Sequence, residues 1–293
     1  MSPLNLTLWA GTLGHHDFAV RLDCAARAGY QAMSVAPWDC RAPDDTRSQA
    51  TSLRKRADDR GVTLSALDPL TTWLSRRDAT PDGAGSEQAS YARLFASYQP
   101  AEIFTMAAEL GVTAVTAVAS GDGICNPAEA ADEFAAACAE AAGYGLSLQL
   151  EFMPFSPIPN LQSAWEVVSG AGAANGGLVL DVWHFRRSGS SLAQLAAIPA
   201  DRLFTVQLSD GPTDPEPNLW HAASHARWLP GSGQLDVTEI LRSVRGMGAR
   251  PEFGPEVVSD SLSVLEPLAA ASRAAEASRQ VLAEAGFSEG TLA

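Results

Sequence analysis

Lysine is almost absent from this sequence. Lys55 is the only lysine among 20 basic residues, and it stands in a charged stretch, Arg54–Arg60, that is typical of an exposed helix face. Schiff-base chemistry needs a lysine that is desolvated in a pocket, so pyridoxal-phosphate enzymes and lysine-dependent aldolases are excluded. The chain also has no GxxxxGK[ST] segment, which excludes a P-loop phosphate site.

Positive charge as a whole is scarce. The 34 acidic residues outnumber the 20 basic ones and give a formal net charge of −14 at pH 7. Binding to a nucleic-acid backbone or to an anionic membrane surface requires clustered Lys and Arg, so neither partner is expected. The 293 residues, of which 46% are apolar, are ample for a buried core, which excludes disorder as the main state.

Long apolar runs and paired cysteines are missing as well. The longest apolar runs have the length of single strands, so no membrane span is expected, and the N-terminus lacks the pattern of a secretory signal. No CxxC pair is present, and the four cysteines are expected to be reduced residues of the core: Cys24, Cys40, Cys125 and Cys138. We therefore expect a cytoplasmic protein.

Short β-rich segments alternate with longer Ala-rich helical segments along the chain. The predicted strands are Asn5–Leu8, Ala32–Val35, Val62–Leu67, Val112–Val118, Leu146–Glu151, Leu178–Asp181, Phe204–Leu208 and Glu252–Val257. The segments between them have the capping residues of helices. Eight such alternations predict a (β/α)8 TIM barrel, an α/β fold. We expect a single domain over residues 1–286, followed by a frayed tail, residues 287–293.

A doubly wound open sheet is the alternative fold. It would normally show a GxGxxG turn after the first strand, and the segment Ala10–His16 lacks that spacing. The long, Pro-rich segment Ser209–Gly233 lies between a predicted strand and a predicted helix. We therefore interpret it as an active-site loop and not as a linker between domains.

Polar residues stand at or near the ends of the last four predicted strands: Glu151, Asp181, Gln207 and Glu256. In a TIM barrel these ends meet at one mouth. Three carboxylates there would repel one another, and a divalent cation removes that repulsion. Oxygen ligands suit Mn²⁺ or Mg²⁺ better than Zn²⁺.

The repulsion between the carboxylates also predicts the effect of a substitution. Because Asp181→Ala removes one of the repelling charges, we expect it to leave the metal-free protein equally stable or slightly more stable.

The strand ends and one loop carry a family resemblance through the segments Glu151–Pro154, Leu180–His184, Val206–Asp210, Arg227–Gly233 and Pro255–Val257. Over nearly the whole chain the sequence resembles the xylose-isomerase-like, or sugar phosphate isomerase/epimerase, TIM-barrel superfamily. The resemblance implies one divalent metal, with Mn²⁺ favoured and Mg²⁺ or Co²⁺ as alternatives. The implied ligands are Glu151, Asp181, Gln207 and Glu256.

The resemblance also implies roles for side chains around the metal. His184 and Arg227 would contact substrate oxygens. Glu151 and Glu256 would face each other across the substrate carbon, one removing a proton and the other returning it, while the metal polarises the neighbouring carbonyl. His15, which follows the first strand at the same mouth, is a further candidate for substrate binding.

Two positions depart from the family pattern. Many members have His where this chain has Gln207; an amide oxygen still ligates a metal, and the change favours harder ions. Ketose 3-epimerases carry another glutamate at the position of Pro157, which argues against ketohexose 3-epimerase activity. The loop around Pro157 is apolar and suits a bulkier or less hydroxylated substrate.

The sequence thus predicts an isomerase or epimerase of a sugar or cyclitol ketone that works by proton abstraction alpha to a carbonyl, through an enediolate that the metal stabilises. A lyase on the same scaffold is the alternative, acting like an inosose dehydratase or by β-elimination from a keto-glycoside, because elimination begins with the same proton abstraction. A DNA-repair endonuclease shares the barrel but would need a basic groove and more metal-binding histidines, and a net charge of −14 with five His argues against it. A non-catalytic sugar-binding subunit is disfavoured because all four expected metal ligands are present. Whether the chain forms a homodimer or a homotetramer stays open.

Two further sets of residues at the predicted mouth have simpler interpretations. Asp68, after the third strand, is interpreted as a capping residue. His221 and His225 lie in the loop before Arg227 and are interpreted as part of a solvated or lid-forming loop.

Overall fold

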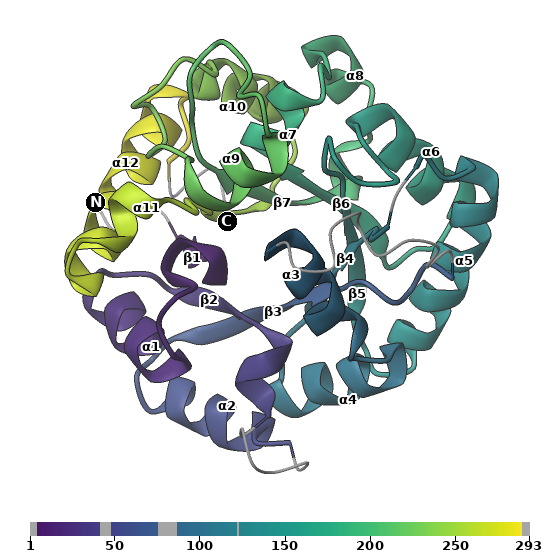
Figure 1. Ribbon diagram of the computed structural model, residues 1–293, viewed down its shortest axis with the longest axis horizontal. Helices are drawn as coiled ribbons and strands as arrows, with labels where there is room; N and C mark the ends of the chain where they lie inside the picture. Colours follow the sequence, from purple (N-terminus) through teal and green to yellow (C-terminus); the bar gives the residue numbers. More distant parts are fainter. Residues whose placement is uncertain (1–4, 42–47, 76–86, 122, 289–293) are drawn as a thin grey trace.

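The computed structural model describes residues 5–41, 48–75, 87–121 and 123–288. Parallel strands lie side by side in chain order and form a nearly closed barrel, with helices as an outer ring (Figure 1). The strands are β1 (Thr7–Leu8), β2 (Ala32–Val35), β3 (Thr63–Leu70), β4 (Ala114–Val118), β5 (Ser147–Glu151), β6 (Gly176–Asp181), β7 (Leu203–Leu208) and β8 (Glu252–Pro255). The predicted TIM barrel is confirmed.

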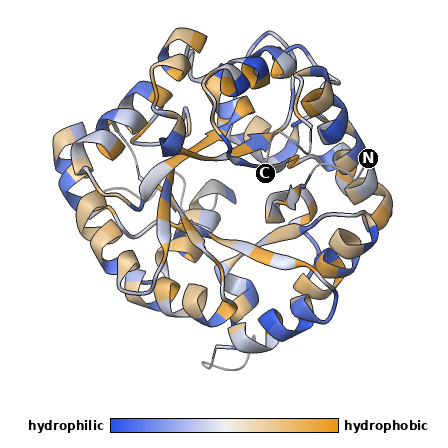
Figure 2. Ribbon diagram, turned by 180° about the vertical axis from the view of Figure 1, so that it is seen from behind, coloured by the Kyte–Doolittle hydropathy of each residue, from blue (hydrophilic) through white to orange (hydrophobic). Residues whose placement is uncertain are grey.

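The helices cover the outer face of the barrel or cross its mouth. They are α1 (Phe18–Arg27), α2 (Ala50–Asp58), α3 (Glu87–Ala96), α4 (Pro100–Leu110), α5 (Pro127–Ala142), α6 (Leu161–Ala171), α7 (Val182–Arg187), α8 (Leu192–Ala196), α9 (Leu219–His225), α10 (Val237–Gly246), α11 (Asp260–Ser263) and α12 (Pro267–Glu284). Hydrophobic residues run along the strands and recur on the surrounding helices (Figure 2). In the described part of the chain, no helix has the length and apolar character to span a bilayer.

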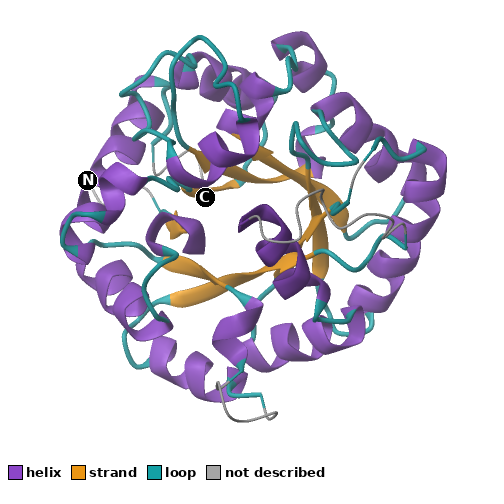
Figure 3. Cartoon of the chain, in the orientation of Figure 1, coloured by secondary structure: helices purple, strands orange, loops and turns teal. Residues whose placement is uncertain are grey.

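The helices α3, α7 and α9 were not expected from the sequence. The segments α3 and α9 lie inside the outer ring, over the barrel mouth (Figure 3). α7 follows β6 directly, because the Asp181 carboxylate caps it by accepting the backbone N–H of His184 at 2.7 Å.

Two expectations for the C-terminal part are corrected. The sequence pattern predicts one helix over Ser261–Ala285. The structure divides it into α11 and α12, because Glu266 precedes Pro267 and is extended, with φ −55° and ψ 134°. Phe287, expected in a frayed tail, is 4% exposed and packs edge-on against Phe253 with ring centroids 4.9 Å apart. Residues 289–293 of that tail lie outside the described residues.

A polar layer inside the barrel fixes the direction of the side chains at the mouth. Gln149 of β5 donates to the Thr116 hydroxyl at 3.1 Å and accepts from Thr205 of β7 at 2.8 Å. β5 and β7 are not neighbours in the sheet, so this bond crosses the barrel interior. Side chains two residues apart share a face, so Glu151 and Gln207 also point inward, at the carboxyl ends of their strands.

The closure between β8 and β1 depends on a glycine. A Cβ atom on Gly254 would lie 1.8 Å from the Thr7 carbonyl oxygen. We expect Gly254→Ala to lower the free energy of unfolding by about 3 kcal/mol, since the backbone of β1 cannot yield without opening the barrel. Urea unfolding measures the change. The matched control is Gly246→Ala, whose new methyl meets no atom within 4 Å; equal midpoints for the two variants would contradict the prediction.

Candidate active site

A cavity of about 640 Å³ opens at the carboxyl ends of the strands. The predicted site residues that line it are His15, Glu151, His184, Arg227 and Glu256. Asp181 and Gln207 are 0% exposed and do not line its surface. They are nevertheless neighbours in the sheet, because Asp181 pairs with Gln207 in the register of β6 and β7. The structure thus gathers the predicted residues at one end of the barrel.

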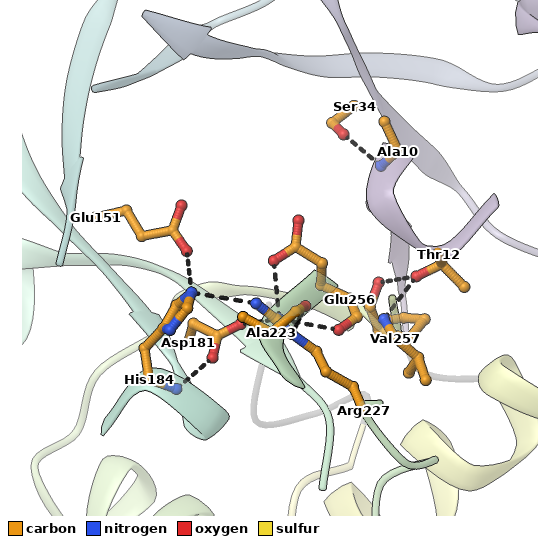
Figure 4. Close-up of polar contacts among 11 residues, drawn as sticks. Ala10, Thr12, Ser34, Glu151, Asp181, His184, Ala223, Arg227, Glu256 and Val257 are labelled. Carbon is orange, nitrogen blue, oxygen red and sulfur yellow. Dashed lines mark hydrogen bonds and ion pairs between the residues drawn. The ribbon is translucent and has the colours of Figure 1, made fainter. Parts of the chain in front are cut away.

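Arg227 is the centre of the polar network (Figure 4). Its Nη1 donates to Asp181 Oδ2 at 2.6 Å and lies 3.3 Å from Glu256 Oε2. Its Nε donates to the carbonyl oxygen of Ala223 at 2.8 Å, and its Nη2 lies 3.1 Å from His184 Nε2. Every nitrogen of the guanidinium therefore has a partner within the protein, which fixes its position.

The loop that carries Arg227 is held by Asp210. One carboxylate oxygen of Asp210 accepts the backbone N–H groups of Gly231 and Gly233, and the other accepts that of Leu235, at 2.9 to 3.0 Å. Asp210 and Trp228 also exchange backbone hydrogen bonds. The carboxylate thus anchors the loop immediately after Arg227 to the end of β7.

His184 is neutral in this environment. The ring is 2% exposed, with Phe155 and Trp183 packed edge-on against it. Burial lowers the pKa of His184 to about 3. A neutral ring that accepts from Arg227 at Nε2 carries its proton on Nδ1. Nδ1 is buried without a hydrogen-bond partner among the described residues, whereas Nε2 lies 3.6 Å from Glu151 Oε1.

The carboxyl groups of the site differ in their protonation. Burial, together with the charges of Glu256, Asp68 and Asp181, raises the pKa of Glu151 well above its usual value. Burial raises the pKa of Glu256 to about 7, although Arg227 acts in the opposite direction. Burial alone would also raise the pKa of Asp181, but interactions with Arg227 and His184 lower it. One arginine therefore supplies too little positive charge to keep all three carboxyls ionised.

The donor set fits a divalent metal. Ligand atoms of Glu151, Asp181 and His184 lie within 4.8 Å of one another. Gln207 is fully buried, and neither its amide oxygen nor its amide nitrogen has a hydrogen-bond partner in the described ranges. A buried amide without a partner is costly, and ligation of a cation by its oxygen removes part of that cost. His184 enters this cluster although it was expected only as a substrate contact.

Asp68 is the site residue that sequence reasoning missed. It lies within β3 and lines the cavity, so its interpretation as a capping residue is wrong. Burial and the charge of Glu256 raise its pKa well above the usual value. The signal was present in the sequence, since Asp68 follows the apolar run Leu64–Leu67 just as Glu151 ends its own strand.

Three helices at the rim of the cavity contact one another through side chains. His225 of α9 lies 3.0 Å from Glu87 of α3 and 3.0 Å from Asp260 of α11. Trp220 of α9 lies near Tyr91 of α3, with ring centroids 6.2 Å apart. These contacts agree with the interpretation of this loop as a lid. His15 lines the same cavity. Burial lowers the pKa of His15, and the neighbouring charge of His16 lowers it further.

The fold and the site geometry coincide with a known family. A family model described as a xylose isomerase-like TIM barrel matches residues 22–284. The chain belongs to this family. Its xylose isomerase-like barrel superimposes on that of the IolI protein described with a bound zinc atom, with a TM-score of 0.80 over 97% of this chain and 100% of the other, at 20% identity. An L-ribulose 3-epimerase gives a TM-score of 0.68 over 97% and 96%, at 15% identity.

Relatives in sequence within the family are enzymes. A 3-dehydroshikimate dehydratase of Pseudomonas aeruginosa is 30% identical over 161 residues, which are 54% of this chain and 25% of that protein. An inosose isomerase of Bacillus subtilis is 28% identical over 107 residues, 36% of this chain and 37% of that protein. The chain thus matches well under half the length of either relative. The relatives in sequence are thus an isomerase and a dehydratase.

Proposed function

We propose that this protein is a divalent-metal-dependent isomerase or epimerase of a sugar or cyclitol ketone. The observation that supports it best is the pair Glu151 and Glu256. Both line the cavity, and they come from β5 and the end of β8, three strands apart in the barrel. Two carboxyls that approach one ligand from different sides suit removal of a proton from one face of a carbon and its return to the other.

The metal would be held by Glu151, Asp181, Gln207 and Glu256, with His184 beside them. When bound, it supplies a positive charge that polarises the substrate carbonyl and lowers the pKa of the adjacent C–H group. Its charge would also favour the ionised form of Glu151, so that this glutamate is a competent base. The oxygen donors favour Mn²⁺, with Mg²⁺ or Co²⁺ as alternatives.

The remaining residues orient and enclose the substrate. Arg227 holds Glu256 through its contact with the carboxylate at 3.3 Å and with the Glu256 carbonyl oxygen at 3.2 Å. His184 lines the cavity beside Glu151 and would contact a substrate oxygen. Aromatic side chains form the outer wall of the cavity and exclude water from the reacting carbon: Trp38, Tyr91, Phe95, Phe155 and Trp220.

A dehydratase is the second candidate, because of the likeness to the 3-dehydroshikimate dehydratase over 161 residues. Elimination of water begins with the same abstraction of an alpha proton. The protonated carboxyl of Glu256 would then donate its proton to the departing hydroxyl group and not to carbon. The two candidates differ only in the fate of the enolate.

The test is incubation of the Mn²⁺-loaded protein with a cyclitol ketone in deuterated solvent, followed by mass measurement. We expect incorporation of deuterium at the alpha carbon without loss of water, and loss of both incorporation and conversion after chelation. Added Mn²⁺ should restore them. Loss of one water from the product would establish the dehydratase instead. Turnover that survives chelation, or no exchange at the alpha carbon of any sugar or cyclitol ketone, would contradict the proposal.

A further inference from the structure

One carboxylate of the cavity has no part in the proposed proton transfer. Asp68 lines the cavity together with Glu151 and Glu256. No other side chain or backbone group within the described ranges gives Asp68 a hydrogen bond or an ion pair. A largely buried carboxylate without a partner is unfavourable, so an acidic side chain at this position calls for a ligand. We propose that Asp68 binds a hydroxyl group of the substrate and makes the site select uncharged substrates over anionic ones.

The cations around the cavity are already committed to other partners. Arg227 is paired with Asp181 and Glu256, and His225 lies between Glu87 and Asp260. The His184 ring is occupied by Arg227, whose Nη2 lies 3.1 Å from its Nε2, and burial lowers the pKa of His15. Among the described lining residues, no unpaired cation is left to receive a carboxylate or a phosphate of the substrate.

The charge balance of the inner site leaves Asp68 in surplus. Glu151, Asp181 and Glu256 contribute three negative charges when ionised, and a divalent metal with Arg227 contributes three positive ones. Asp68 is a further acidic group that no cation opposes, and burial together with the charge of Glu256 raises its pKa. A metal bound beside Glu256 would offset that charge, lower the pKa of Asp68 again and favour its ionised form. An anionic group placed next to it would be repelled, because a like charge in a low-dielectric cavity is costly. A hydroxyl group would instead donate a hydrogen bond to the carboxylate.

The walls of the cavity agree with an uncharged ring as the occupant. Trp38 and Phe95 pack with ring centroids 5.6 Å apart, and both line the cavity. Such faces accept the apolar C–H side of a polyhydroxylated ring, while Asp68 accepts one of its hydroxyl groups. The inference rests on the proposed function for the identity of the reaction, but the recognition step is measured without turnover.

The experiment compares two unreactive rings by calorimetry, with and without Mn²⁺: myo-inositol, which is uncharged, and quinate, which carries a carboxylate. We expect the wild type to bind myo-inositol at least about tenfold more tightly than quinate. In Asp68→Asn, which keeps a hydrogen-bonding group but removes the charge, quinate binding should tighten by about tenfold while myo-inositol binding changes less than about threefold. Asp68→Ala should weaken myo-inositol binding by about tenfold.

The matched control is Asp201→Asn, which removes the same charge at an exposed position before β7, at the opposite end of the barrel. It should change neither affinity. Asp68→Ser serves as a second uncharged variant if Asp68→Asn does not fold. Equal affinities of the wild type for the two rings, no detectable myo-inositol binding, or no gain for quinate in the uncharged variants would each overturn the proposal. Because these are binding measurements, a failure of the proposed reaction alone would leave them unchanged.

Discussion

Asp181→Ala is expected to lose metal binding and activity together and to destabilise the protein even without metal. The Asp181 side chain is 0% exposed, and each of its oxygens has a partner. Oδ1 caps α7, and Oδ2 accepts from Arg227 at 2.6 Å. Removal of one partner of a buried ion pair costs about 3–5 kcal/mol because the other charge stays buried and unpaired. Urea unfolding of the chelated protein and metal titration measure the two effects.

A double variant separates the ion pair from the other effects of the substitution. In Asp181→Ala the buried guanidinium of Arg227 keeps only Glu256, at 3.3 Å, as an ionic partner. Arg227→Leu in that background removes the under-compensated charge, so the double variant should be more stable than Asp181→Ala alone. Asp181→Asn keeps an oxygen that caps α7 and should fall between the wild type and Asp181→Ala. An unchanged unfolding midpoint for metal-free Asp181→Ala would show that the pair with Arg227 contributes nothing to stability.

The sequence led to the opposite expectation for this variant. Three carboxylates at strand ends predict mutual repulsion, and relief of that repulsion predicts an equally stable or more stable metal-free protein. The structure adds the guanidinium of Arg227, which is 46 residues away in the chain. Long-range pairing of this kind depends on the path of the loop after β7, which Asp210 anchors through backbone N–H groups. Strand patterns do not encode that path.

The parts of the site that follow from strand geometry were predictable. Glu151 and Gln207 end apolar strands, and the alternation of side chains directs both into the barrel once the fold is known. The short helices were not predictable, because α7 has six residues and depends on a cap from Asp181. The pairing of His225 with Glu87 likewise joins residues 138 positions apart. Contacts between loops are fixed by the assembled barrel and not by local propensity.

Glu256→Gln is expected to lower the turnover number by about 10²–10⁴-fold, the usual contribution of a general acid or base. The amide keeps an oxygen that can ligate the metal, so metal binding should be partly retained at raised metal concentration.

Glu256→Gln also removes a buried carboxyl group that titrates. Burial raises the pKa of Glu256 to about 7, so the metal-free wild type loses stability as the pH rises from about 4.5 toward 7. Glu256→Gln lacks this group and should lose less stability over that range.

Glu252→Gln makes the same chemical change in the same strand, four residues earlier, where the carboxyl hydrogen-bonds to the Thr7 hydroxyl and does not line the cavity. It should retain turnover near the wild-type rate, so a loss confined to Glu256→Gln reports on the site and not on β8.

Exchange of the substrate's alpha proton with deuterated solvent distinguishes the two glutamates. If Glu151 removes the proton and Glu256 returns one to the opposite face, exchange should continue in Glu256→Gln while net conversion falls. In Glu151→Gln, exchange and conversion should fall together, because the first step is lost. Together, exchange and conversion in the two variants show which glutamate removes the proton and which returns it, and turnover numbers alone do not. Near wild-type conversion by metal-loaded Glu256→Gln would leave Glu256 as a ligand only and would rule out the mechanism with two glutamates.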